Sequence, residues 1–250
     1  MLPLAPSNDV LWPSAMGINI AQVVRHWAVR DPARTALMLG EDAHAALTYG
    51  DLDLRARRAA AALSRFGLVA GDRIAVSVPN GLGFLDAWFG GLYAGCTILP
   101  IPPMSAPPEL SARIRHARCR ALVTERETEA LGRAALASCP DVRAIDASAL
   151  SDATSAVDAP LDLPPETAAM ILYTSGTTGT SKGALITHAS LAVHTAALVH
   201  HVLRLGEDDR VLAALPLTHS YGIRMTLLAP FYAGARSVLL ARSRSAAGEG

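Results

Sequence analysis

The stretch YTSGTTGTSKG, which runs from Tyr173 to Gly183, gathers residue types that together bind phosphate. It follows an apolar segment at 169–174 that is typical of a buried strand. Its glycines allow backbone N–H groups to come close to an anion, its hydroxyl side chains donate hydrogen bonds, and Lys182 supplies a positive charge. The pattern predicts a phosphate-binding loop. The alternative is a solvated surface turn, because Ser, Thr and Gly are also the ordinary residues of turns.

This loop does not have the spacing of a Walker-type P-loop, which needs a glycine, four residues and then Gly-Lys-Ser or Gly-Lys-Thr. Four residues separate Gly176 from Ser181, which stands where the second glycine should be. Gly183 follows Lys182 where the magnesium-binding hydroxyl should be. The spacing therefore argues against a kinase or GTPase of the P-loop class.

The elements that lead up to this loop alternate between strand and helix patterns. Helices are predicted at 19–27 and 52–66 by their apolar spacing, with Asn19 as a cap and Gly67 as a stop. The alternation that follows requires crossovers between strands, and therefore mostly parallel pairing. Its predicted strands lie at 73–78, 97–101, 121–124 and 142–145, and its helices at 85–93, 109–116 and 127–136. These patterns predict an α/β fold.

A stretch at 148–165 has no periodicity and is rich in Ser, Asp, Ala and Pro, so we expect a surface connection there. Beyond it, strands are predicted at 169–174, 184–187, 211–215 and 237–240, with helices at 188–203 and 221–232. The expected organisation is a loose N-terminal arm at 1–17, a first α/β lobe at 18–165, the start of a second lobe at 166–241 and a tail at 242–250.

Composition limits the class of partner. Lys plus Arg and Asp plus Glu number 22 each, so no strong overall field would attract nucleic acid or an anionic membrane. The N-terminus lacks a basic region and carries prolines where a signal peptide needs its apolar segment. The apolar stretch from Gly83 to Pro103 is interrupted by Asp86, which favours a buried helix and strand over a membrane span. We expect a cytoplasmic protein.

Two sets of side chains that could bind a metal ion lack the pattern for it. The cysteines are odd in number and not closely paired, which favours reduced thiols in the core: Cys96, Cys119 and Cys139. Three histidines fall on one predicted helix, but no Cys, Asp or Glu completes a ligand set: His194, His200 and His201. No metal ligand is predicted.

YTSGTTGTSKG followed by ALITHASL resembles the phosphate loop of the AMP-binding superfamily, which includes acyl-CoA synthetases, carrier-protein adenylation domains and luciferases. LTYGDL at 47–52, GDRIA at 71–75 and the AG…P turn at 94–100 resemble further elements of the family in the same order. One departure is Ser181, where members usually have proline. The resemblance extends from about Ile18 to Leu240. It implies layered, mostly parallel sheets flanked by helices, as in the large N-terminal domain of acetyl-CoA synthetase-like enzymes, with the second lobe incomplete.

The resemblance also implies which residues act. The loop residues would bind the phosphates of ATP: Thr174, Ser175, Gly176, Thr177, Thr178, Gly179 and Lys182. PLTHSYG at 216–222 resembles the family's P-L-x-H-x-x-G element, whose histidine borders the acyl pocket and the thiol tunnel, so His219 is the catalytic candidate. An isolated histidine after a strand is otherwise more often structural.

In the reaction that the resemblance implies, a carboxylate attacks the α-phosphorus of ATP to give acyl-AMP, and a thiol then displaces AMP. ATP, Mg²⁺ and coenzyme A are the expected cofactors, and a fatty or aromatic acid is the expected substrate. Loading of a carrier protein and nucleotide binding without turnover are the alternatives. The family's Y-G-x-T-E and T-G-D elements and its C-terminal catalytic lysine do not occur in these 250 residues. We therefore expect an N-terminal fragment of such a ligase, inactive alone.

Overall fold

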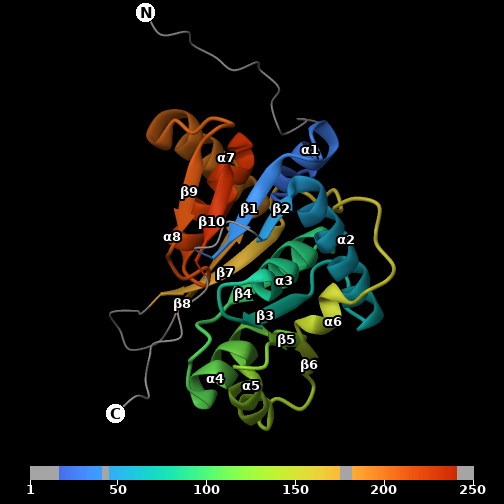
Figure 1. Cartoon of the computed structure of the whole chain (residues 1–250). Coiled ribbons are helices and arrows are strands. Elements are labelled where there is room, and N and C mark those ends of the chain that lie inside the picture. The colour runs from blue at the N-terminus through green and yellow to red at the C-terminus, as the bar shows by residue number, and fades with distance from the viewer. Residues whose placement is uncertain (1–16, 41–44, 175–181, 241–250) are drawn as a thin grey trace, which may run out of the picture.

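The structure is a computed structural model that describes residues 17–40, 45–174 and 182–240. The predicted tail, and the predicted N-terminal arm apart from Gly17, lie outside the described residues. Two sheets flanked by helices form the described part of the chain, as Figure 1 shows. The predicted fold class, a layered α/β arrangement with mostly parallel strands, is confirmed.

The larger sheet has six strands in the order β6-β5-β3-β4-β7-β8. All neighbouring pairs are parallel except β7 and β8, which are antiparallel. Its strands are β3 (Arg73–Ser77), β4 (Thr97–Pro100), β5 (Ala121–Thr124), β6 (Arg143–Asp146), β7 (Ala168–Thr174) and β8 (Lys182–Thr187). The strands β3, β4 and β5 are almost wholly buried, because both faces of a parallel sheet are covered.

Helices cover both faces of this sheet. On one face α2 (Tyr49–Arg65) packs on α3 (Leu82–Tyr93), and α3 contacts β3 and β4. On the other face α4 (Pro107–Ala117) and α5 (Glu129–Leu136) enclose a second, smaller apolar core. The apolar stretch from Gly83 to Pro103 is thus a buried helix and strand, as predicted. No helix in the described ranges is long and apolar enough to cross a bilayer.

The smaller sheet joins the two ends of the described chain. Its order is β2-β1-β10-β9, in which β1 pairs with β10 in parallel and with β2 in antiparallel orientation. Its strands are β1 (Thr35–Leu39), β2 (Ala45–Thr48), β9 (Arg210–Ala213) and β10 (Arg236–Leu239). Strands from before and after residue 165 therefore occur in both sheets. The division into lobes at that residue stays a prediction.

Local signals place several helix ends. Thr48 caps α2: its hydroxyl accepts a hydrogen bond from the Asp51 N–H at 3.1 Å, and the Asp51 carboxylate accepts one from the Thr48 N–H. α1 (Gln22–Arg30) begins later than predicted. Asn19 lies ahead of it, where its side chain accepts from the Ala21 N–H and donates to two carbonyls elsewhere in the chain.

Two regions differ from the prediction. The stretch predicted as a surface connection contains a short helix, α6 (Ser148–Ser151), whose Leu150 is fully buried against the core. The two C-terminal helices contain π-helical segments: α7 (His188–Ala197) continues as η1 (Leu198–Leu203), and α8 (Ser220–Ile223) continues as η2 (Arg224–Leu228) and α9 (Ala229–Ala233). The segment η2 ends just before Pro230, which has no N–H to donate to the preceding turn.

Candidate active site

The two ends of the predicted phosphate loop are held together by the antiparallel pair β7 and β8. Tyr173 pairs with Gly183, and Thr174 pairs with Lys182. The loop therefore leaves the sheet and returns to it at neighbouring positions. The predicted site residues between them lie outside the described residues: Ser175, Gly176, Thr177, Thr178 and Gly179.

Lys182 is the only lysine in the chain, since 21 of the 22 basic residues are arginines. It is exposed at the first position of β8 and forms no ion pair with a carboxylate among the described residues. An ammonium is a compact point charge, whereas a guanidinium is a planar fork. A lysine at this position suits the predicted phosphate site, because its compact charge can approach a single oxygen closely.

Tyr173, at the base of the loop, is fixed by residues from α4. Its hydroxyl lies 2.5 Å from Nδ1 of His116, and the guanidinium carbon of Arg113 lies 5.6 Å from the centre of its ring. A Cβ atom on Gly183 would lie 3.2 Å from the same ring, so a residue without a side chain suits the facing position. Burial raises the pKa of the Tyr173 hydroxyl. Sequence reasoning missed His116 and Arg113, because no local spacing connects α4 with β7.

His219 caps the start of α8. Its Nδ1 accepts a hydrogen bond from the Tyr221 N–H at 3.2 Å, so the neutral ring carries its proton on Nε2. The backbone N–H of His219 donates to the Pro216 carbonyl at 3.1 Å. A Cβ atom on Gly222 would lie 2.2 Å from that carbonyl oxygen, which only glycine avoids. The segment 216–222 is thus a tight turn that presents an exposed imidazole.

The structure brings Thr174 and Lys182 together but joins neither to His219 by a hydrogen bond or ion pair within its described residues. His219 lies between β9 and α8, beside the smaller sheet, whereas the loop base belongs to the larger one. The remaining histidines have other surroundings. Nε2 of His200 lies 3.2 Å from the Tyr232 hydroxyl, and burial together with the nearby Arg224 lowers the pKa of His194.

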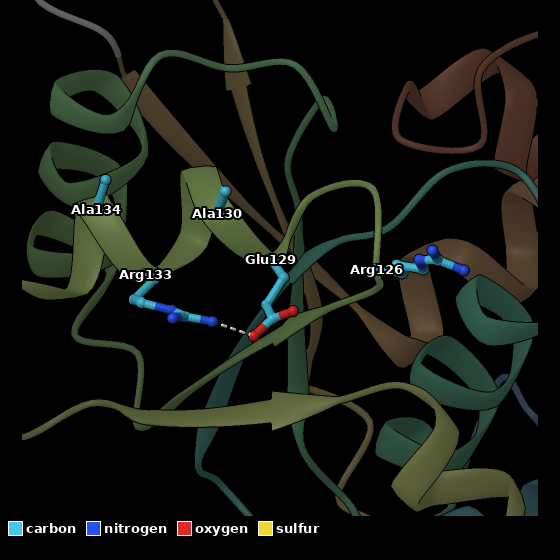
Figure 2. Close-up of a pocket in the computed structure, with 5 residues that line it drawn as sticks. All are labelled: Arg126, Glu129, Ala130, Arg133 and Ala134. Carbon is cyan, nitrogen blue, oxygen red and sulfur yellow. Dashed lines mark hydrogen bonds and ion pairs between the residues drawn. The ribbon is translucent and has the colours of Figure 1, made fainter.

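Two cavities border α5 rather than the predicted site. One, of about 420 Å³, is a shallow hollow over the exposed face of α5, where Figure 2 shows Arg133 paired with Glu129. The other, of about 550 Å³, lies between α3, α5 and β6 and includes Asp86 and Glu125 in its lining. Thr174, Lys182 and His219 line neither cavity. Thr174, Lys182 and His219 therefore stay predicted site residues, which neither cavity supports.

The sequence of this chain matches the family model described as AMP-binding enzyme over residues 24–248. The chain belongs to the AMP-binding enzyme family. It is 34% identical over 237 residues to a sulfoacetate–CoA ligase from Cupriavidus necator, covering 92% of this chain and 46% of the relative. It is 32% identical over 213 residues to 4-coumarate–CoA ligase 5 from Oryza sativa subsp. japonica, covering 78% of this chain and 38% of the relative.

The fold of this AMP-binding chain is also that of a solved CoA ligase. A benzoate CoA ligase from Burkholderia xenovorans LB400 superposes with a TM-score of 0.81 and 26% identity, covering 90% of this chain and 45% of that structure. The predicted membership of the AMP-binding superfamily is confirmed. The chain spans less than half the length of these relatives.

Proposed function

We propose that this chain is the N-terminal part of a ligase that uses ATP to activate a carboxylic acid as acyl-AMP and then forms a thioester with coenzyme A. The observation that carries the proposal is the family match over residues 24–248, which includes both the loop base and the His219 turn. The matched relatives are CoA ligases, which favours coenzyme A over a carrier protein as the thiol.

The phosphate loop acts in this proposal as an electrostatic clamp. Negative charge builds up on the departing pyrophosphate, and a fixed cation together with hydrogen-bond donors stabilises it in the transition state. Lys182 is already exposed at the loop base and has no acidic partner to release among the described residues. Its ammonium is therefore available to a phosphate oxygen without the loss of an existing ion pair.

His219 is assigned a role beside the acyl group. Its tautomer leaves the Nε2 proton available as a hydrogen-bond donor, while Nδ1 is engaged by the Tyr221 N–H. A donor of this kind suits an oxygen atom of the carboxylate or of the acyl phosphate. The relatives that act on 4-coumarate and benzoate support an aromatic acid, and the sulfoacetate relative supports a small anionic one.

Mg²⁺, when bound with ATP, would supply positive charge that offsets the negative charge of the phosphates in such a reaction. Among the residues that the structure describes, no three His, Cys, Asp or Glu side chains gather in a way that could hold a metal ion. We therefore assign no metal ligand to this stretch.

We also propose that these 250 residues alone bind the phosphates of ATP but do not complete adenylation. ATP–pyrophosphate exchange measured on the isolated chain would test this.

The single lysine allows a direct test of the clamp. Reductive methylation with ¹³C-formaldehyde labels Lys182 and the N-terminal amine while it keeps the positive charge, so NMR follows one lysine signal during a titration with pyrophosphate or ATP. We expect that signal to shift. Lys182→Ala should weaken pyrophosphate binding about 10- to 100-fold in calorimetry, since hydrogen bonds to charged groups contribute roughly 1.5–3 kcal/mol.

Two controls define the result. Lys182→Arg keeps the charge and should retain part of the affinity, and Arg133→Ala removes an exposed charge on α5 and should leave the affinity unchanged. Equal affinities for the wild type and Lys182→Ala, or a lysine signal that stays fixed while pyrophosphate binds, would remove Lys182 from the site.

A further inference from the structure

Asn80 connects the larger sheet to the segment that carries His219. It lies three residues beyond Ser77, the last residue of β3, at the carboxyl end of that strand. Its Nδ2 donates a hydrogen bond to the Leu215 carbonyl at 2.9 Å, and its Oδ1 accepts one from the Leu217 N–H at 2.9 Å. One side chain thus binds the two residues on either side of Pro216.

These two bonds replace the pairing that a neighbouring strand would provide. β9 ends at Ala213, so the segment that follows leaves the hydrogen-bonded ladder of the smaller sheet. Pro216 has no N–H of its own. The amide of Asn80 carries both a donor and an acceptor, and it satisfies the backbone groups on both sides of Pro216. Leu217 is fully buried, so its N–H would otherwise be removed from water without a partner.

The position of Pro216 in turn determines that of His219. The Pro216 carbonyl accepts the His219 N–H at 3.1 Å, and its oxygen occupies the space where Gly222 would carry a side chain. The imidazole is then held by the Tyr221 N–H at 3.2 Å. A continuous series of contacts therefore leads from Asn80, through the turn, to the ring of His219.

We infer that Asn80 is a positioning residue: its two bonds to the backbone around Pro216 keep the imidazole of His219 in one orientation and one tautomer. The significance of that tautomer for acid activation rests on the proposed function. The positioning itself does not, because it is a property of the unliganded chain. Asn80 does not touch the ring and acts only through the backbone of the turn.

A simpler role would be to tie the two sheets together and stabilise the fold. The two roles differ in what they predict for the ring. If Asn80 only stabilises, any substitution that costs the same stability elsewhere should have the same effect on His219. If it positions, the ring should respond to Asn80 alone. Thr48→Ala is a suitable control, because it removes the cap of α2, and Thr48 has no hydrogen bond to the turn among the described residues.

The experiment is ¹⁵N NMR of the full chain labelled at its eight histidines, at a pH near 8 where imidazoles are neutral. His219→Gln identifies the His219 signals by their loss. In the wild type we expect two widely separated ring nitrogens, with Nδ1 unprotonated and Nε2 protonated. In Asn80→Ala we expect their separation to fall by at least half, as the two tautomers become similarly populated. Thr48→Ala should retain the wild-type separation.

Asn80→Asp serves if the alanine variant does not fold. The carboxylate keeps an acceptor for the Leu217 N–H but has no proton to donate to the Leu215 carbonyl, so the separation should fall in the same direction. Ring signals unchanged in both variants, or changed equally in Thr48→Ala, overturn the inference. Because no ligand is present in this NMR experiment, failure of the positioning inference is distinct from failure of the proposed function. If the proposed function fails, the chain binds neither ATP nor pyrophosphate, while the ring signals of His219 behave as expected.

Discussion

The stability of this protein should depend on pH through His188, the first residue of α7. His188 is fully buried, and its Nδ1 accepts a hydrogen bond from the Ile20 N–H at 3.0 Å. Burial lowers its pKa from 6.5 to about 4, because the charged imidazolium is disfavoured away from water. The unfolded chain then binds this proton more readily than the folded one. The stabilisation is complete above about pH 7 and is lost as the pH falls from 6.5 towards 4.

The size of this effect follows from the two pKa values. A difference of one pKa unit corresponds to about 1.4 kcal/mol. Because the pKa of His188 is 6.5 in the unfolded chain and about 4 in the folded one, the free energy of unfolding should fall by roughly 3 kcal/mol as the pH is lowered from 7 to 4. His188→Asn removes the titration while its side-chain oxygen can still accept from the Ile20 N–H. Urea unfolding of the wild type and His188→Asn from pH 4 to pH 8 gives the free energy of unfolding of each protein. The difference between the two, followed against pH, isolates the contribution of His188.

We expect the variant to be less stable at pH 8, because the smaller side chain leaves unfilled space, and its disadvantage to shrink as the pH falls. Other groups that titrate contribute equally to both proteins and cancel. Curves that stay parallel over the whole range would show that His188 is not held neutral by burial, and the reasoning would fail.

Two further substitutions test local geometry. Gly222→Ala places a Cβ atom 2.2 Å from the Pro216 carbonyl oxygen. Since the backbone on both sides is held, we expect the free energy of unfolding in urea to fall by about 1–3 kcal/mol and the ring signals of His219 to change. An unchanged unfolding midpoint would mean that the turn relaxes freely. Thr48→Ala removes the cap of α2 and should cost about 1 kcal/mol, while Thr48→Ser, which keeps the hydroxyl, should cost less; equal losses would assign the effect to the methyl group.

The sequence was sufficient for features whose cause lies within a few residues. The helices predicted at 52–66 and 109–116 are present as α2 and α4. They begin two or three residues earlier than predicted, α2 after the cap formed by Thr48 and Asp51, and α4 at Pro107. The buried face of α1 follows from the spacing of its apolar residues. The three cysteines are buried free thiols, as their spacing indicated. Such features depend on propensity and periodicity, which a short window of sequence contains in full.

Features that depend on pairing across long separations could not be predicted in this way. Nothing in the spacing around Asn80 indicates that it meets Leu215 and Leu217, and nothing around His116 indicates that it meets Tyr173. The assignment of strands to two sheets was likewise missed, since alternation of strands and helices is the same whether consecutive strands share a sheet or not. In each case the partner is fixed by the packing of the whole core.

The pairing of β1 with β10 has a consequence for folding of the chain during its synthesis on the ribosome. Leu37 lies opposite Ser237, so one partner is synthesised about 200 residues after the other. At roughly 5–20 residues per second, β1 waits on the order of 10–40 s before its neighbour exists. The six strands of the larger sheet lie within 73–187 and are available earlier. In the interval the apolar β1 has an unpaired edge towards β10, and such an edge favours aggregation of the nascent chain.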